Sequence, residues 1–333
     1  MGQRLTPLFS VIVCTRNRCT ELPRCISSIL GQRFNDFELI IVDGNSSDGT
    51  SDYLNMLLQS WDERIVVARQ PGRGLPNARN CGIHLSRGKY LLFLDDDTEL
   101  QEDFMHELKR SYEHLSLLHG RLGGIGAAGS LHQKVLPKAT ALSILKGMID
   151  YALMGAYQFW EAGNLLLVNK QMIGRFFPSG FWVSNFEYAQ RVTKVDAIGG
   201  YCMSVERDAL FKIGLFNERL GRTYPTCDDS EFCYRMGRSG YTLMIVPKLH
   251  LRHYESDKAR SRTSAVEESS AVANWIWFAV NVWCGKNFLK IGAVALVLAI
   301  RILAVVFAIL RKTRSLADLQ RLIQSIAFGL STT

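Results

Sequence analysis

The sequence predicts an α/β protein with a Rossmann-like, mostly parallel sheet and helices on both of its faces. Two observations carry this prediction. Short runs rich in Val, Ile and Leu alternate with segments whose apolar residues recur at helical spacing through the first hundred residues. The connections between these runs are short, which favours parallel strands joined by right-handed helical crossovers.

The first four strands and their intervening helices follow in order along residues 8–97. We expect strands over 8–14, 37–43, 64–68 and 90–94, and helices over 22–30, about 50–59 and 75–85. The apolar positions of the first helix recur at helical spacing up to Gly31, where glycine ends it.

The pattern is less regular after residue 100. We expect a helix over 102–119, a small glycine-rich strand over 122–129, a strand within 195–207, a helix over 229–239 and a strand over 242–246. Residues 131–195 are rich in aromatic side chains and show no period that assigns their elements. Residues 256–270 are polar, and we expect this segment to be mobile.

Composition and charge limit the class of protein. Apolar residues make up 47% and charged residues 21% of the 333, enough for a sizeable core and unlike a disordered or collagen-like chain. The last 49 residues hold seven bases and one acid, so they carry +6 of the net +8. A nucleic-acid-binding protein would be expected to carry basic residues across the surface of its folded domain. Here most of the net charge lies in the last 49 residues, so we expect no nucleic-acid partner. The eight cysteines include no Cys-x-x-Cys pair, and with no apparent export signal we expect free thiols in a reducing cytosol.

The C-terminal residues 261–333 indicate a membrane-associated helical region. Residues 291–310 hold a single charge, Arg301, and are long enough to cross a bilayer. Residues 316–330 have the spacing of an amphipathic helix. Spanning the membrane and dipping into its cytoplasmic leaflet both fit this pattern.

Polar side chains lie at the ends of the predicted parallel strands, where ligands of such sheets bind. Asn17 follows the first strand, Asp43 ends the second, and residues 95–97 are three consecutive aspartates after the fourth. Adjacent carboxylates repel each other, and a divalent cation such as Mg²⁺ or Mn²⁺ would compensate them. A solvated acidic turn is the alternative interpretation of these three residues.

Several further segments stand with these aspartates in the order and spacing of family 2 glycosyltransferases, which the chain resembles over about residues 8–256. The matching segments are Val11–Asn17, Phe37–Asp43, Ser46–Thr50, Ala78–Gly82, Phe93–Asp97, Gly199–Gly200, Phe216–Glu218, Asp228–Arg235 and His253 with Ser256.

This resemblance implies a GT-A fold, a nucleotide-sugar donor, a divalent metal (Mg²⁺ or Mn²⁺) and transfer with inversion. It also implies the site residues. Thr15, Asn17 and Asp43 would line the nucleotide, and Arg79 would reach the nucleotide or its phosphates. Asp95 and Asp96 would bind the donor, and the metal would be held by Asp95, Asp97 and His253. The catalytic base would be Asp229, with Asp228 as the alternative.

The sequence departs from the family pattern at two positions. Gly44 follows Asp43 where many UDP-using members carry a second aspartate, which leaves UDP-, GDP- and dTDP-sugars open as donors. The family's Glu-Asp motif reads Asp228–Asp229. No Gln-x-x-Arg-Trp motif follows, which argues against a processive cellulose or chitin synthase.

Structural interpretations of the same residues stay open at this point. Asp43 would cap the loop or helix that follows it, Arg79 would be a surface ion-pair residue, and His253 would be a structural histidine. One of Asp228 and Asp229 is expected to cap the helix over 229–239, because aspartate is a preferred N-cap residue.

The function expected from the resemblance is sugar transfer to a hydroxyl of a glycan or lipid-linked acceptor at the cytoplasmic face of the cell membrane, in cell-surface polysaccharide or glycoconjugate synthesis. Residues 1–260 would form the catalytic domain, with a nucleotide-sugar half over 8–100 and an acceptor half over 101–260. A sugar nucleotidyltransferase is the alternative enzyme, disfavoured because Thr15–Arg18 holds no glycine. An inactive sugar-binding or scaffold protein is the non-enzymatic alternative, and the retained Asp95, Asp97 and Asp229 argue against it.

Overall fold

The computed structural model describes residues 6–60, 62–128, 173–176, 180, 182–184, 186–221, 227–254, 265–310 and 314–330. The chain divides into two compact units. Unit 1 comprises Met1–Gln133 and Ala189–Ser256, and unit 2 comprises Lys134–Tyr188 and Asp257–Thr333. Most of the aromatic-rich segment over 131–195, to which the sequence assigned no elements, lies outside the described residues.

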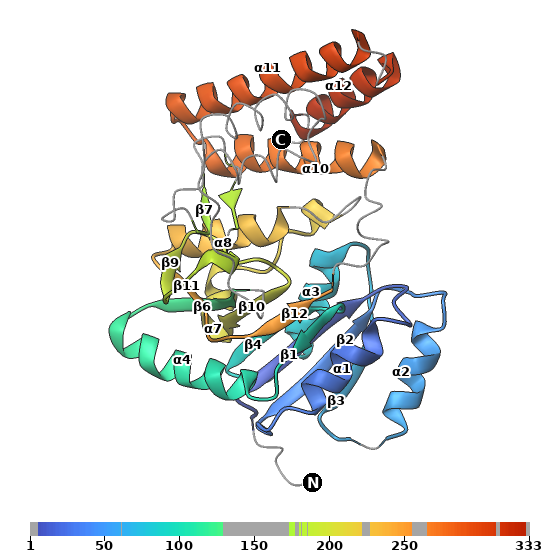
Figure 1. Ribbon diagram of the computed structural model, residues 1–333, viewed down its shortest axis with the longest axis vertical. Helices are drawn as coiled ribbons and strands as arrows, with labels where there is room; N and C mark the ends of the chain where they lie inside the picture. The colour runs from blue at the N-terminus through green and yellow to red at the C-terminus, as the bar shows by residue number, and fades with distance from the viewer. Residues whose placement is uncertain are drawn as a thin grey trace. The chain divides into compact units, whose positions relative to one another are not determined.

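Unit 1 is built around a sheet that has eight strands within the described residues, in the order β3-β2-β1-β4-β10-β6-β11-β9 (Figure 1). Strands β3, β2, β1 and β4 are parallel, β10 runs antiparallel to both of its neighbours, and β6 and β11 are parallel to each other. The strands are β1 (Phe9–Thr15), β2 (Phe37–Asp43), β3 (Ile65–Arg69), β4 (Tyr90–Asp95), β6 (Leu122–Ala127), β9 (Thr193–Val195), β10 (Cys202–Glu206) and β11 (Thr242–Val246).

Helices cover both faces of this sheet, as the sequence predicted. The helices of unit 1 are α1 (Leu22–Leu30), α2 (Thr50–Leu58), α3 (Leu75–Leu85), α4 (Phe104–Leu118), α7 (Arg207–Ile213) and α8 (Asp228–Arg238), with a 3-10 turn η2 (Glu218–Gly221). Buried residues of α1, α2 and α4 pack in one cluster with Val11 and Val13 of β1. On the opposite face α3 approaches so closely that a Cβ on Gly82 would lie 2.5 Å from Ile12 Cγ2, which explains the glycine there.

The second face is completed by a cluster of three aromatic rings that joins the sheet to α8. The ring of Phe216 lies 5.3 Å from that of Phe93 on β4 and 4.5 Å from that of Phe232 on α8, measured between centroids. This contact fixes α8 over the sheet, with its first turn at the end where the parallel strands finish.

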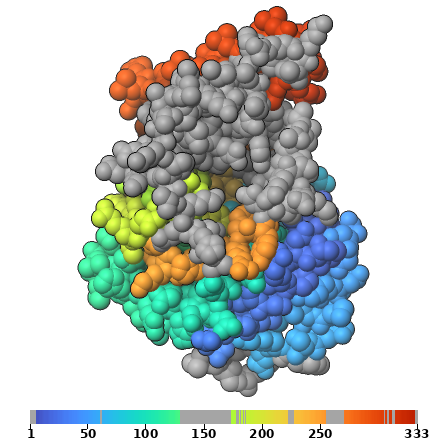
Figure 2. Space-filling view, in the orientation of Figure 1, coloured from blue at the N-terminus to red at the C-terminus, as the bar shows by residue number. Residues whose placement is uncertain are grey.

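A short antiparallel ribbon lies beside this edge of the sheet. It consists of β5 (Thr98–Leu100) and β12 (Leu251–His253), and its register places His253 opposite Thr98. In Figure 2, residues near β12 (orange) reach the surface between the blue N-terminal elements and the green segment around α4. The ribbon thus brings His253, near the end of unit 1, next to the turn that follows β4.

A buried carboxylate, that of Glu38, stabilises the sheet where β1 and β2 begin. Glu38 accepts hydrogen bonds from the Ser10 hydroxyl (2.6 Å) and from the backbone N, Nε and Nη2 of Arg87 (2.7, 2.8 and 2.6 Å). Glu38→Ala is therefore expected to lower the free energy of unfolding by about 3 kcal/mol, because buried donors lose their acceptor. Glu113→Ala, which removes an exposed pair with Lys109, should cost less than about 1 kcal/mol. Chemical denaturation of both variants checks this, and equal stabilities would contradict it.

Unit 2 contains helices packed against one another and a short ribbon. Its elements are β7 (Arg175–Phe176), β8 (Trp182–Val183), a 3-10 turn η1 (Phe186–Tyr188), α10 (Ala265–Phe278), a π-helical turn η3 (Ala279–Trp283), α11 (Phe288–Leu310) and α12 (Leu316–Leu330). Helices α10 and α12 meet closely at Gly329, where a Cβ would lie 2.8 Å from the carbonyl oxygen of Ala273. Of the segment 256–270, residues 265–270 begin α10 and residues 256–264 lie outside the described residues, so its mobility stays a prediction.

Helices α11 and α12 confirm the helical interpretation of the C-terminal residues. Among the described residues, however, no helix combines the length and the apolar character that crossing a membrane requires.

Candidate active site

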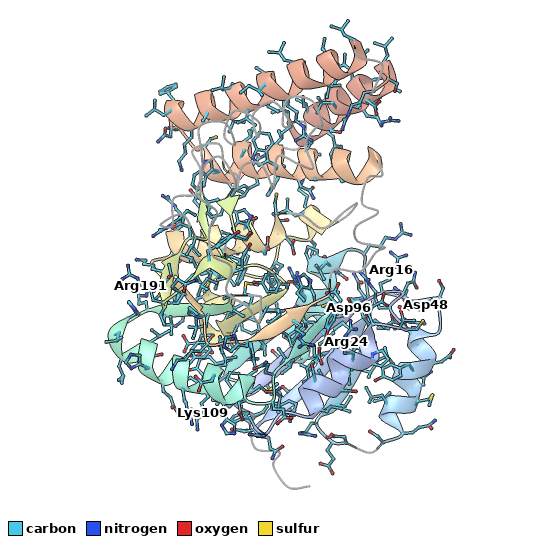
Figure 3. The ribbon with its side chains drawn as sticks, viewed as in Figure 1. Arg16, Arg24, Asp48, Asp96, Lys109 and Arg191 are labelled. Carbon is cyan, nitrogen blue, oxygen red and sulfur yellow. The ribbon has the colours of Figure 1, made fainter. Side chains whose placement is uncertain are left out.

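The acidic residues of the sequence pattern meet where the parallel strands end. Asp95 is the last residue of β4, and Asp96 and Asp97 form the turn into β5. Asp96 is labelled in Figure 3 on the same side of unit 1 as Asp48, which belongs to the loop after β2. Because β1, β2 and β4 are parallel neighbours, Thr15, Asp43 and Asp95 end at the same edge of the sheet.

Asp95, Asp97 and His253 form a cluster with the donor set of a metal site. Their ligand atoms all lie within 4.8 Å of one another. His253 Nε2 is 3.1 Å from Asp97 Oδ1 and 3.9 Å from Asp95 Oδ2. Asp97 Oδ1 is buried and accepts no well-aligned hydrogen bond from the described residues, despite the nearby imidazole nitrogen. Two carboxylates and one imidazole suit Mn²⁺ and are compatible with Mg²⁺, so these residues fit a divalent cation.

The electrostatics of the turn favour a cation. Burial raises the pKa of the Asp96 carboxyl to about 7, an effect that the Thr15 hydroxyl and the Arg18 guanidinium partly offset. Burial also raises the pKa of Asp95, while Arg79 and His253 lower it and Asp97 adds repulsion. A positive ion at this turn would stabilise the ionised carboxylates.

Asp43 holds the loop that follows β2. Its carboxylate accepts hydrogen bonds from Ser46 N (3.0 Å), Ser46 Oγ (2.6 Å) and Ser51 Oγ (2.9 Å). Asn17, with a positive φ of 56°, accepts from Ser47 N at 2.8 Å and ties the same loop to the end of β1. The structure thus shows the capping interactions that the alternative interpretation expected for Asp43, and a contact of either residue with a nucleotide stays a prediction.

Arg79 lies in the interior and not at the surface. Its side chain is 4% exposed, and Nη1 donates to Asp228 Oδ2 at 2.6 Å. Nη2 donates to the carbonyl of Gly200 at 3.1 Å and lies 3.8 Å from Asp95 Oδ1. Arg79 therefore joins the first turn of α8 to the end of β4, and the nucleotide contact implied by the resemblance stays a prediction.

The two acids of α8 differ in their surroundings. Asp228 is buried against Arg79, whereas Asp229 is partly exposed and accepts from Gly200 N at 2.9 Å and from Ser230 N at 2.7 Å. Burial and the neighbouring Asp228 raise the pKa of Asp229 to about 6, while Arg79 and the two backbone hydrogen bonds lower it.

Neither acid is the N-cap of α8, so the capping expectation is wrong. The cap position is Cys227, in a left-handed conformation with φ of 66°, and it makes no side-chain capping bond. Asp229 does share a helix face with the buried Phe232, Cys233 and Met236, as its spacing predicted.

Sequence reasoning did not single out two residues that the structure brings to this site. Arg18 places Nε 3.7 Å from Asp96 Oδ1. Tyr201 stacks on the imidazole of His253, with ring centroids 5.1 Å apart and planes inclined by 13°. The available signals were a second arginine in Thr15–Arg18 and an aromatic residue directly after Gly199–Gly200.

Known glycosyltransferases share this α/β GT-A-like fold and are similar to part of the sequence. Residues 10–118 match the model of glycosyl transferase family 2. Over this first third of the chain the sequence is thus similar to glycosyltransferases of that family.

Two relatives illustrate the similarity in sequence. A PGL/p-HBAD biosynthesis glycosyltransferase of Mycobacterium tuberculosis is 42% identical over 96 residues, which cover 29% of this chain and 38% of the relative. The GalNAc(5)-diNAcBac-PP-undecaprenol beta-1,3-glucosyltransferase of Campylobacter jejuni is 36% identical over 114 residues, covering 33% and 37%. The matched part thus spans well under half the length of these relatives.

Solved structures show the same fold at low sequence identity. The mannosyltransferase PcManGT of Pyrobaculum calidifontis, in complex with GDP-Man and Mn²⁺, has a TM-score of 0.56 at 15% identity, covering 97% of this chain and 81% of that one. GalNAc-T7 with UDP, GalNAc and Mn²⁺ has a TM-score of 0.60 at 17% identity, covering 85% and 49%.

Proposed function

We propose that this chain is an inverting, metal-dependent glycosyltransferase that moves a sugar from a nucleotide donor to a hydroxyl of a glycan or lipid-linked acceptor. The observation that carries the proposal is the cluster of Asp95, Asp97 and His253 at the edge where the parallel strands end. Among the described residues, none donates an aligned hydrogen bond to the buried Asp97 Oδ1. Asp229 is linked to this cluster through Gly200 and Arg79.

Asp95, Asp97 and His253 would hold the cation, either Mg²⁺ or Mn²⁺. When bound, the cation supplies positive charge that stabilises the departing nucleoside diphosphate. Arg79 keeps Asp228 occupied in an ion pair, so this acid is not free to accept a proton from the acceptor.

Asp229 acts as the general base. It accepts the proton of the acceptor hydroxyl while the acceptor oxygen forms a bond to the anomeric carbon and the bond from that carbon to the diphosphate oxygen breaks. Attack from the face opposite the diphosphate inverts the anomeric configuration. Asp229 Oδ1 accepts from the backbone N and the hydroxyl of Ser230, whereas Oδ2 accepts from Gly200 N and keeps a further lone pair for the hydroxyl proton.

The donor is tested by calorimetry with UDP-, GDP- and dTDP-sugars, each in the presence and absence of Mn²⁺. The solved neighbours that bind GDP-Man or UDP with Mn²⁺ support this choice of panel. We expect one nucleotide class to bind with a clear dependence on the metal. Donor hydrolysis with and without EDTA, measured alongside, separates an enzyme from an inactive protein of the same fold.

The pH dependence of kcat should reflect the protonation of the Asp229 carboxyl. Because the pKa of this carboxyl is raised to about 6, it is protonated at lower pH and cannot accept the hydroxyl proton. We expect kcat to rise about tenfold per pH unit below about pH 6 and to level off above it. A profile that is flat from pH 4.5 to 8 would contradict this assignment of the base.

The acceptor is proposed to be lipid-linked, and the enzyme is proposed to work at the cytoplasmic face of the cell membrane. One relative is named for an undecaprenol-linked acceptor. In unit 2, Leu289, Leu296 and Leu303 of α11 are 84%, 61% and 66% exposed. This apolar surface stands in a basic segment, a combination that favours attachment to an anionic lipid surface.

Replacing Leu289, Leu296 and Leu303 together by Glu is expected to lower binding to vesicles containing phosphatidylglycerol at least tenfold, because the carboxylates oppose both burial and anionic lipid. Leu117→Glu is the control, since Leu117 is 87% exposed on α4 of unit 1. Vesicle co-sedimentation of full-length protein measures the change. Unchanged binding of the triple variant would overturn the attachment surface.

A further inference from the structure

The turn over Gly199–Tyr201, directly before β10, contacts the proposed base and two of the three proposed metal ligands, Asp95 and His253. The Gly200 N–H donates to Asp229 Oδ2 at 2.9 Å, and the Gly200 carbonyl accepts from Arg79 Nη2 at 3.1 Å. The next carbonyl, that of Tyr201, accepts from Asp95 N at 3.1 Å. One turn thus touches both the helix that carries the base and the strand end that carries the metal ligands.

The ring of Tyr201 restricts His253. The two rings are nearly parallel, with planes inclined by 13° and centroids 5.1 Å apart. The Tyr201 hydroxyl donates to the carbonyl of Ala127 on β6 at 3.1 Å, so the phenol ring is anchored at its far end. A rotation that turned His253 Nε2 away from Asp95 and Asp97 would have to break this stack.

Gly200 is required by the closeness of Arg79. A Cβ at position 200 would lie 2.6 Å from Arg79 Nη2 and 3.2 Å from Nη1, so any side chain there displaces the guanidinium. That guanidinium is paired with Asp228, and its displacement would disturb the first turn of α8. The geometry of Asp229 therefore depends on the absence of a side chain at Gly200.

We propose that Gly200 and Tyr201 are positioning residues, which hold the base Asp229 and the metal ligand His253 in one fixed geometry relative to Asp95. The inference rests on the proposed function. It adds that the two residues act separately: Tyr201 on the affinity for the metal, and Gly200 on the rate of transfer.

The first test measures Mn²⁺ affinity of the full-length protein by calorimetry. Partners that orient a metal ligand typically contribute 10- to 100-fold in affinity. We expect Tyr201→Leu to bind Mn²⁺ at least about tenfold more weakly, and Tyr201→Phe, which keeps the ring, to stay within about threefold of the wild type. Tyr241→Leu is the matched control, because Tyr241 is also partly buried but precedes β11 at the opposite edge of the sheet.

Thermal unfolding of Tyr201→Leu and Tyr241→Leu separates a loss of fold from a loss of position. Affinity of Tyr201→Leu equal to that of the wild type would overturn the role of Tyr201. An equal loss in Tyr201→Leu and Tyr201→Phe would also overturn it, because the ring would then not be the cause. If the wild type itself binds no Mn²⁺, it is the proposed metal dependence that fails.

The second test compares Gly200→Ala with Gly237→Ala. Gly237 lies on α8 with nothing within 4 Å of an added Cβ, so its substitution controls for the change of residue type. A misplacement of about 1 Å at a reacting group can cost about 100-fold in rate. We expect Gly200→Ala to lower kcat about 100-fold while Mn²⁺ affinity stays within about threefold, and Gly237→Ala to retain wild-type kcat. Wild-type kcat in Gly200→Ala, or a loss of metal affinity equal to its loss of rate, would overturn the role of Gly200.

Discussion

Asp97→Asn is expected to lower turnover by about 1,000-fold or more while the protein stays folded. Asp97 Oδ1 is buried 3.1 Å from His253 Nε2 and has no aligned donor in the described part of the chain, which fits an oxygen that binds a cation. The amide of asparagine has nearly the same shape but no charge, and it cannot compensate a divalent ion. The measurement is kcat at saturating donor and Mn²⁺, together with Mn²⁺ affinity by calorimetry.

Asp208→Asn serves as the control for this substitution. Asp208 is an exposed acid on α7, and it lies outside the cluster of metal-ligating residues. It should retain the rate and metal affinity of the wild type. Full activity of Asp97→Asn, or of the wild type in excess EDTA, would exclude the metal role.

Asp229→Asn is expected to lower kcat for transfer by about 10²- to 10⁴-fold, because it removes the general base. Donor and metal affinity should be retained, because Asp229 is not among the residues proposed to bind either of them. Asp228→Asn should have a smaller effect on kcat. It should instead reduce stability by about 3 kcal/mol, because Arg79 is 4% exposed and would lose the charge of its partner.

Comparing the two variants separates the roles of these adjacent acids. The measurements are kcat for each variant, donor affinity by calorimetry, and unfolding in denaturant. A larger loss of kcat in Asp228→Asn would move the base by one residue. Rates near the wild type in both would remove α8 from the mechanism.

The first half of the fold follows from local sequence signals. Strands β1, β2 and β4 are mostly apolar because parallel strands in the interior are buried on both faces, and β2 is buried at every position. The end of α1 at Gly31 and the three aspartates at the end of β4 and in the turn after it mark boundaries in the sequence itself. The parallel arrangement then brings the strand ends together.

The β5–β12 ribbon could not be predicted in this way. Each of its strands has three residues, too few to show a period, and they pair across about 150 positions of the chain. His253 entered the candidate metal site through the family resemblance alone, and its position beside Asp97 depends on this long-range pairing.

The different surroundings of Asp228 and Asp229 could not be predicted from the sequence either. Helical spacing placed Asp229 on the buried face but did not indicate that Arg79, 149 positions earlier, pairs with Asp228. The same limit applies to Gly200 and Tyr201, whose contacts depend on the meeting of β4, β10 and α8. Residues at a strand end are local features, whereas the pairing of their charges depends on the tertiary fold.

The roles proposed for Asp95, Asp97, His253 and Asp229 all require metal-dependent sugar transfer. The decisive measurement is release of the nucleoside diphosphate and formation of product with the donor that binds best and a lipid-linked acceptor, before and after removal of metal with EDTA and after Mn²⁺ is added back. We predict that EDTA abolishes transfer, that Mn²⁺ restores it, and that the product has the inverted anomeric configuration. Transfer at an unchanged rate in EDTA, or a product that retains the donor's configuration, would contradict it.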